Sequence, residues 1–141
     1  MSQTNVQFAV AAHIMAALGV NHGEALRSTV LAMSVNADAS FVRRVISKLA
    51  KAGLVTTTRG KNGACALSRP PAEITLLDIY RASEAPESFS VHRYPVSESC
   101  LVSRNIKGCM ESILCQAQHA FEQGLAEQSL ASVVERVRDG S

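Results

Sequence analysis

The segment SFVRRVISKLAKAG, residues 40–53, constrains the fold of this chain more than any other. Its apolar residues recur at i, i+3, i+4 and i+7, which is the spacing of one face of an α-helix. Serines, arginines and lysines occupy the remaining surface, and Gly53 supplies a C-terminal stop. The stripe that must be buried against a domain core consists of Val42, Val45, Ile46 and Leu49.

A β-hairpin is predicted directly after this helix. Residues 54–58 and 64–67 are short β-rich runs, and the tip RGKNG between them holds two glycines and two cations. Two further helices are expected earlier in the chain, over residues 4–19 and 24–33. Helices joined by a short polar turn and followed by a cationic hairpin predict a winged helix-turn-helix, in a mainly α fold with a small β-hairpin.

The exposed side of residues 40–51 has the chemistry of a helix that reads DNA. Such a helix needs cations and hydroxyls that fit the major groove, which is about 12 Å wide. Side chains near its N-terminus are expected to reach base edges, whereas later lysines and the hairpin tip would contact phosphates. The predicted base contacts are Ser40, Phe41, Arg43 and Arg44, and the predicted phosphate contacts are Lys48, Lys51, Arg59 and Lys61.

Charged helix faces are most often simply solvated, so the helix alone does not establish DNA binding. The 14 Lys and Arg residues barely exceed the 12 Asp and Glu residues, which gives a formal net charge of +2. The placement of the cations, together with the hairpin, favours double-stranded DNA as the partner. A protein-interaction module that has lost DNA binding is the alternative. No enzyme is expected, because no nucleophile with a base, phosphate loop or pair of carboxylates is recognisable.

The C-terminal part of the chain predicts an arm for self-association. A fourth helix is expected over residues 72–84, followed by a loop over 84–99. From Cys100 to Gly124 the pattern predicts a helix of six or seven turns, which is too long for the small domain before it and should pair with a second copy. The expected organisation is a winged-helix domain at 1–83, the loop, and a dimerisation helix with a short closing helix at 100–141.

Residues 40–82, SFVRRVISKLAKAGLVTTTRGKNGACALSRPPAEITLLDIYRA, closely resemble the core of the Rrf-two (BadM) family of bacterial winged-helix transcriptional regulators. The resemblance extends over essentially the whole chain. It implies a homodimer whose long helices cross, with each winged helix reading half of a near-palindromic operator, usually to repress. Some members, such as IscR and NsrR, hold an iron–sulfur cluster with three cysteines around the start of the long helix. The segment SFSVHRYPVSESC, residues 88–100, looks more like the cluster-free branch typified by YwnA.

The four cysteines, without a secretory signal, predict a reducing cytoplasm. Cys100 is the candidate redox-reactive thiol, because unsatisfied N–H groups at a helix start favour the thiolate, although an inert packed thiol is equally open. Cys109 shares the apolar stripe of the long helix and is expected to be a small hydrophobe of the dimer interface. Cys65, in the hairpin, is expected to face inward.

Metal binding is the weaker interpretation of the cysteines in and before the long helix. Cys115 lies one turn from Glu111 and one turn from His119, which is a short set for a metal site. An iron–sulfur cluster held by Cys100, Cys109 and Cys115 ranks third, behind a dimerisation helix and a thiol switch. No cofactor is favoured, no apolar run is long enough for a membrane span, and the effector is left open.

Overall fold

The computed structural model describes residues 4–58, 63–84 and 91–140. The chain forms two compact units. The first comprises Met1–Pro86 together with Leu125–Ser141, and the second comprises Glu87–Gly124. Because the first unit contains both ends of the chain, the segment predicted as one arm at 100–141 is divided between the two units.

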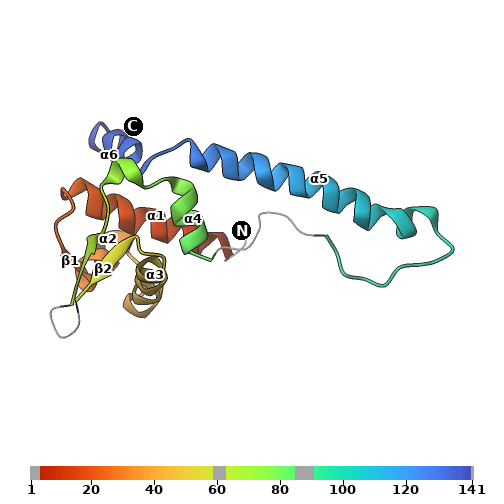
Figure 1. Ribbon diagram of the computed structural model, residues 1–141. Coiled ribbons are helices and arrows are strands. Elements are labelled where there is room, and N and C mark those ends of the chain that lie inside the picture. Colours follow the sequence, from red (N-terminus) through yellow and green to blue (C-terminus); the bar gives the residue numbers. More distant parts are fainter. Residues whose placement is uncertain (1–3, 59–62, 85–90, 141) are drawn as a thin grey trace. The chain divides into compact units, whose positions relative to one another are not determined.

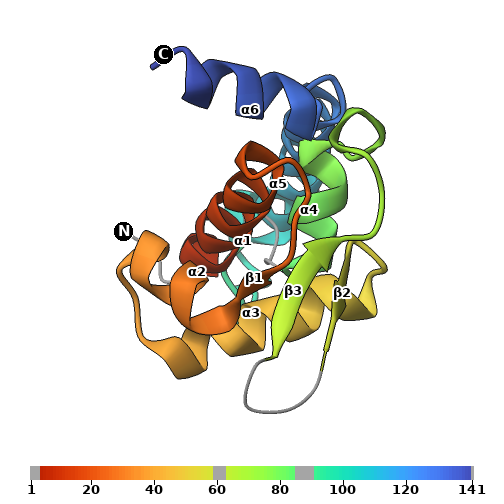
Figure 2. The same ribbon diagram turned by 90° about the vertical axis from the view of Figure 1, so that its left-hand side faces the viewer.

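Helix α1 is the centre of the first unit. A largely apolar helix must be covered by its neighbours, and α1 (Thr4–Val20) contacts the sheet and the helices around it, while Val6, Ala9 and His13 stay exposed. Ile14, Met15 and Leu18 are fully buried within it. Four helices surround α1: α2 (Ser28–Val35), α3 (Ala39–Lys51), α4 (Leu76–Ala82) and α6 (Leu130–Arg138). Figure 2 shows them gathered around it.

A three-stranded antiparallel sheet carries the hairpin. Strands β2 (Val55–Thr57) and β3 (Ala64–Leu67) confirm the two predicted runs, and β1 (Leu26–Arg27) pairs with the other edge of β3. The prediction of a helix from residue 24 was therefore wrong in its first turn. Backbone pairing of Leu26 with Cys65 overrides the local helical pattern, and α2 begins only at Ser28.

Helix α3 begins at a well-formed cap. The Asp38 carboxylate accepts a hydrogen bond from the Phe41 N–H at 3.3 Å and another from the Ser40 hydroxyl. These bonds, that from Ser40 first, hold the pKa of Asp38 below its usual value. A depressed carboxylate pKa means that this stabilisation is present above the unfolded-state pKa and is lost as the pH falls through the folded-state value. The cap therefore fixes the start of α3 at neutral pH.

The closing helix α6 belongs to the first unit, not to the arm. The Leu130 N–H donates to the Ile74 carbonyl at 2.7 Å, and the Leu76 N–H donates to the Gln128 carbonyl at 2.9 Å. These bonds join the start of α6 to the start of α4. The predicted start at residue 72 was wrong, because Thr75 and Asp78 form a capping box that begins α4 at Leu76, after a short 3-10 helix at Pro71–Glu73. The apolar face of α6 then packs on α1, which explains why an amphipathic segment near the C-terminus completes the core of the N-terminal domain.

The second unit is a long helix preceded by an irregular segment. Figure 1 shows α5 (Leu101–Ala126) as one continuous helix, which confirms the predicted long helix to within two residues at its C-terminus. The segment before it is attached to its first turns: the Ser97 N–H donates to Ser103 Oγ at 2.7 Å, and the Lys107 ammonium donates to the Tyr94 carbonyl. Among the described residues, no helix has the length and apolar character that crossing a membrane requires.

The close contact between α1 and α6 requires a glycine. A Cβ at Gly19 would lie 2.5 Å from Val134 Cγ2. We expect Gly19→Ala to lower the free energy of unfolding by about 1–2 kcal/mol, because overpacking outweighs the better helix propensity of alanine. Urea denaturation measures this change. Gly124→Ala is the matched control in α5, since its Cβ would meet nothing within 4 Å. Equal stability of the two variants would contradict this packing.

Candidate nucleic-acid interface

The arginines predicted to reach DNA bases lie on the exposed side of α3. Arg43 and Arg44 are exposed, whereas the apolar stripe of the same helix is buried in the core. The Arg44 guanidinium carbon lies 5.7 Å from the centroid of the half-buried Phe41 ring. A cation over an aromatic face is attracted to it, so Phe41 restrains the direction of Arg44. Phe41 therefore positions an arginine as well as presenting its own edge.

Two of the side chains predicted to contact DNA already bond to other residues of this chain. The Ser40 hydroxyl donates to Asp38 and serves the helix cap. The Lys48 ammonium donates to Gln7 Oε1 at 2.5 Å and lies 3.5 Å from a carboxylate oxygen of Glu84. The Lys48 side chain is only 27 % exposed, so a phosphate would have to compete with both partners. Lys51, one turn later, is exposed.

A depression of about 310 Å³ lies between α3 and the hairpin. Arg43 lines it together with a set of hydroxyls that the sequence did not single out. Hydroxyls commonly donate to the DNA backbone, and a helix N-terminus such as that of α2 presents free N–H groups to phosphate. The run of threonines at the end of β2 could have indicated these hydroxyls from the sequence. Ser28 could not be recognised, because the predicted helix began at residue 24 and placed Ser28 inside it instead of at the helix N-terminus. The added residues are Ser28, Ser47, Thr57 and Thr58.

The tip of the hairpin holds the other two predicted phosphate contacts, Arg59 and Lys61, and both fall outside the described residues. The base of the hairpin is described. There the Thr58 hydroxyl oxygen accepts from the Ala64 N–H at 2.9 Å, and the Thr58 N–H donates to the Ala64 carbonyl at 2.9 Å. The tip is thus mounted on a closed strand pair beside α3.

A family model described as "Iron-dependent Transcriptional regulator", named Rrf2, matches residues 4–136. This chain belongs to the Rrf2 family. The HTH-type transcriptional regulator YwnA of Bacillus subtilis (strain 168) is 37 % identical over 131 residues, which cover 92 % of this chain and 96 % of YwnA. Rrf2 proteins are transcriptional regulators with a DNA-binding winged helix, so the predicted function class is confirmed.

Solved structures share this architecture. A crystal structure described as that of a DNA-binding protein is 35 % identical, with a TM-score of 0.70 over 90 % of this chain and 97 % of the other. CymR, the global cysteine regulator of Bacillus subtilis, has a TM-score of 0.65 at 24 % identity over 96 % of this chain and 95 % of its own. IscR of T. potens has a TM-score of 0.67 at 20 % identity, over 100 % and 90 % of the two chains. The last two likenesses show the Rrf2 fold alone.

The cysteines differ sharply in their surroundings. Cys65 is buried in the sheet, as its alternation predicted, and burial raises the pKa of its thiol to about 11. Cys100 is exposed and immediately precedes α5, where its Sγ accepts from the Ser103 N–H at 3.4 Å. It therefore stands at the N-cap position, one residue before the first turn of the helix, in which it was predicted to lie. Cys109 is exposed in the single chain, so the expectation that it is buried concerns a surface between two copies.

The three cysteines of the second unit do not fit an iron–sulfur cluster. Cys109 and Cys115 lie six residues apart in one helix, and Cys100 stands just before it. With a rise of 1.5 Å per residue, the Cα atoms of Cys100 and Cys115 are separated by roughly 22 Å along the axis, too far for both to ligate one cluster. Among the described residues, no group of three or more His, Cys, Asp or Glu side chains is placed to hold a metal ion.

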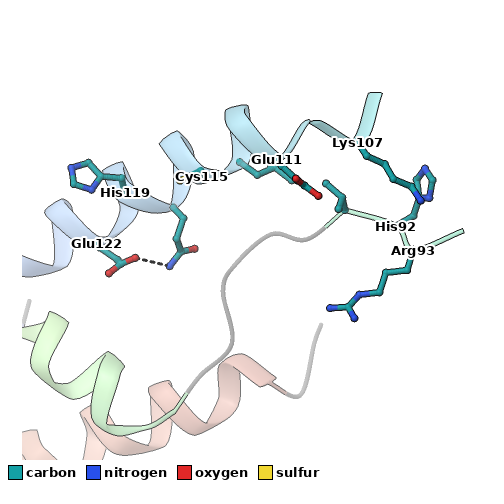
Figure 3. Close-up of a pocket in the computed structure, with 10 residues that line it drawn as sticks. His92, Arg93, Lys107, Glu111, Cys115, His119 and Glu122 are labelled. Carbon is teal, nitrogen blue, oxygen red and sulfur yellow. Dashed lines mark hydrogen bonds between the residues drawn. The ribbon is translucent and has the colours of Figure 1, made fainter. Parts of the chain in front are cut away.

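The trio Glu111, Cys115 and His119 lines a larger depression of about 740 Å³ in the second unit. Figure 3 shows these side chains at successive turns of α5, with His119 directed away from Glu111. Gln118, which is buried, donates to Glu122 Oε2 at 3.2 Å beside them. The predicted metal interpretation of the trio therefore gains no support from its geometry.

The two lysines of α3 provide a matched test of the interface. We expect Lys51→Ala to reduce the slope of log Kobs against log salt concentration by about 0.9, the contribution of one phosphate contact. Lys48→Ala should leave the slope nearly unchanged, because its ammonium already has Gln7 and Glu84 as partners. Fluorescence anisotropy with one labelled duplex at several salt concentrations measures both slopes. Equal reductions would show that Lys48 leaves these partners for DNA.

Proposed function

We propose that this Rrf2 regulator is a cytoplasmic homodimeric repressor that binds a near-palindromic operator through α3 and the hairpin and responds to oxidation of Cys100. The observation that carries the DNA-binding surface is the exposed arginine pair beside a hydroxyl-lined depression. Arginine donates bidentate hydrogen bonds to guanine in the major groove, while hydroxyls and lysines contact the DNA phosphates and so position the protein on the duplex. Binding of such a dimer would block transcription by occupying the promoter.

An exposed apolar stripe on α5 supports the homodimer. Val102 and Ile113 are 64 % and 51 % exposed in the single chain. Cys109 lies between them at helical spacing, and all three fall within about 40° around the helix axis. Large apolar side chains in a row on one helix mark an interaction surface, and an isologous pairing of two such helices buries both stripes. The two copies of α3 would then face two symmetric half-sites.

Cys100 is the proposed signal receiver because its thiol is exposed and sits at the junction between the irregular segment and α5. Peroxide would oxidise the thiolate to a sulfenic acid: an S–O bond forms, the O–O bond breaks, and the released hydroxide takes a proton to become water. Loss of the Sγ contact with the Ser103 N–H would loosen the start of α5. A signal alters operator affinity only if the oxidised and reduced forms differ in DNA-binding free energy.

Sequence discrimination should depend on Arg44. We expect Arg44→Ala to lose about 1–3 kcal/mol of discrimination between a duplex selected from a random library and a scrambled duplex, while the dimer remains intact. Competition titrations measure the discrimination, and analytical ultracentrifugation measures the dimer. Arg136→Ala, which removes an arginine from α6, is the control and should bind as the wild type does. Wild-type discrimination by Arg44→Ala would refute the assignment of α3.

Oxidation should act through Cys100 alone. We expect hydrogen peroxide to weaken operator binding of the wild type by about tenfold or more, and Cys100→Ser to abolish this response without changing the affinity of the reduced protein. Cys65→Ala is the matched control and should keep the response, since burial leaves almost none of the Cys65 thiol as thiolate near neutral pH. A response that survives in Cys100→Ser would place the sensing chemistry elsewhere.

A further inference from the structure

A second surface of the first unit carries charges that DNA binding does not use. It is a depression of about 660 Å³ bounded by the end of α1, the segment that follows β3, and α6. This volume is within the range of small-molecule sites. Gly19 and Val134 are among its lining residues, together with His22, Arg69 and Arg138.

Arg138 is held in place by the end of α1. Its Nη2 donates to the Val20 carbonyl at 2.8 Å and to the Gly19 carbonyl at 3.4 Å, and it lies 3.5 Å from His22 Nδ1. Free carbonyls at a helix C-terminus attract a cation, so this contact fixes the guanidinium. The bonds use one of its nitrogens, which leaves the other N–H donors of the planar group for a further acceptor.

Arg69 contributes a second cation that has no counter-ion. Within the described ranges, neither Arg69 nor Arg138 forms an ion pair with a carboxylate. Glu135 also lines the depression and is likewise not paired with either arginine there. Two guanidiniums against one carboxylate leave the lining with a net positive charge. Because β3 runs from the hairpin tip towards Leu67, Arg69 follows the strand end that is remote from the tip.

We propose that this depression binds a small organic anion whose carboxylate or phosphate group is held by Arg69 and Arg138. Planar guanidiniums bind such groups bidentately, and Glu135 accepts a hydroxyl or amine of the same ligand. The ligand would join the segment leaving the hairpin to the helix that follows α5 along the chain. It would therefore stabilise the arrangement in which the segment after β3 and α6 lie close together.

The test titrates isotope-labelled full-length protein with sodium citrate, and separately with inorganic phosphate, at constant ionic strength. Amide chemical shifts should change around residues 19–23, 67–72 and 131–138. Arg69→Gln and Arg138→Gln should each weaken the apparent affinity by about tenfold or more, since each removes a charge-assisted contact. Arg136→Gln, an equal charge change on α6 outside the lining, should stay within about twofold of the wild type.

The two anions distinguish the ligand source. A response to citrate alone indicates a carboxylate ligand, a response to phosphate alone indicates a phosphate-bearing ligand, and a response to both supports the shared anion chemistry. Arg69 has no hydrogen bond or ion pair in the part of the chain that the structure describes, so its substitution keeps the test valid if Arg138→Gln loosens α6. No localised shifts with either anion, or an equal loss in Arg136→Gln, would overturn the proposal.

Discussion

The burial of the apolar residues of α1 is the constraint on which the rest of the first unit depends. A largely apolar helix in a small domain must be covered by its neighbours, and α2, α3, α4, α6 and the sheet each cover part of it. A T-shaped contact between Phe8 and Tyr80, with centroids 5.3 Å apart, joins α1 to α4. Because α3 commits its apolar stripe to this core, its arginines have to face outward. The exposure of the proposed DNA-binding surface is thus a consequence of how the core is closed.

A helix near the C-terminus completes this core. Helix α6 follows α5 within a few residues and packs on α1, with Gly19 permitting the contact and Arg138 capping the end of α1. The same first unit therefore contains both α3, the proposed DNA-reading helix, and α6, which follows α5 in the sequence. Lys48 adds a link of another kind, since it ties α3 to Gln7 and Glu84 instead of presenting its charge freely.

The features that the sequence could predict are those with a strong apolar periodicity or with clear turn-forming residues. The stripe of α3, the hairpin and the length of α5 follow from spacing and turn residues alone, and the structure confirms them. Contacts between distant segments were not predictable in this way. Strand β1 forms because β3 offers an edge, and the placement of α6 depends on a glycine 115 positions earlier than its partner Val134. The internal engagement of Lys48 likewise requires two residues far from it in sequence.

The account rests on the claim that the α3 side of the first unit binds DNA sequence-specifically. The most direct measurement is an anisotropy titration of the wild-type protein against a duplex selected from a random library and against its scrambled version, at two salt concentrations. The account predicts tighter binding to the selected duplex and a steep loss of affinity for both duplexes as salt rises. Weak association that is insensitive to salt and sequence would contradict it and would favour a protein-interaction module built on the Rrf2 fold.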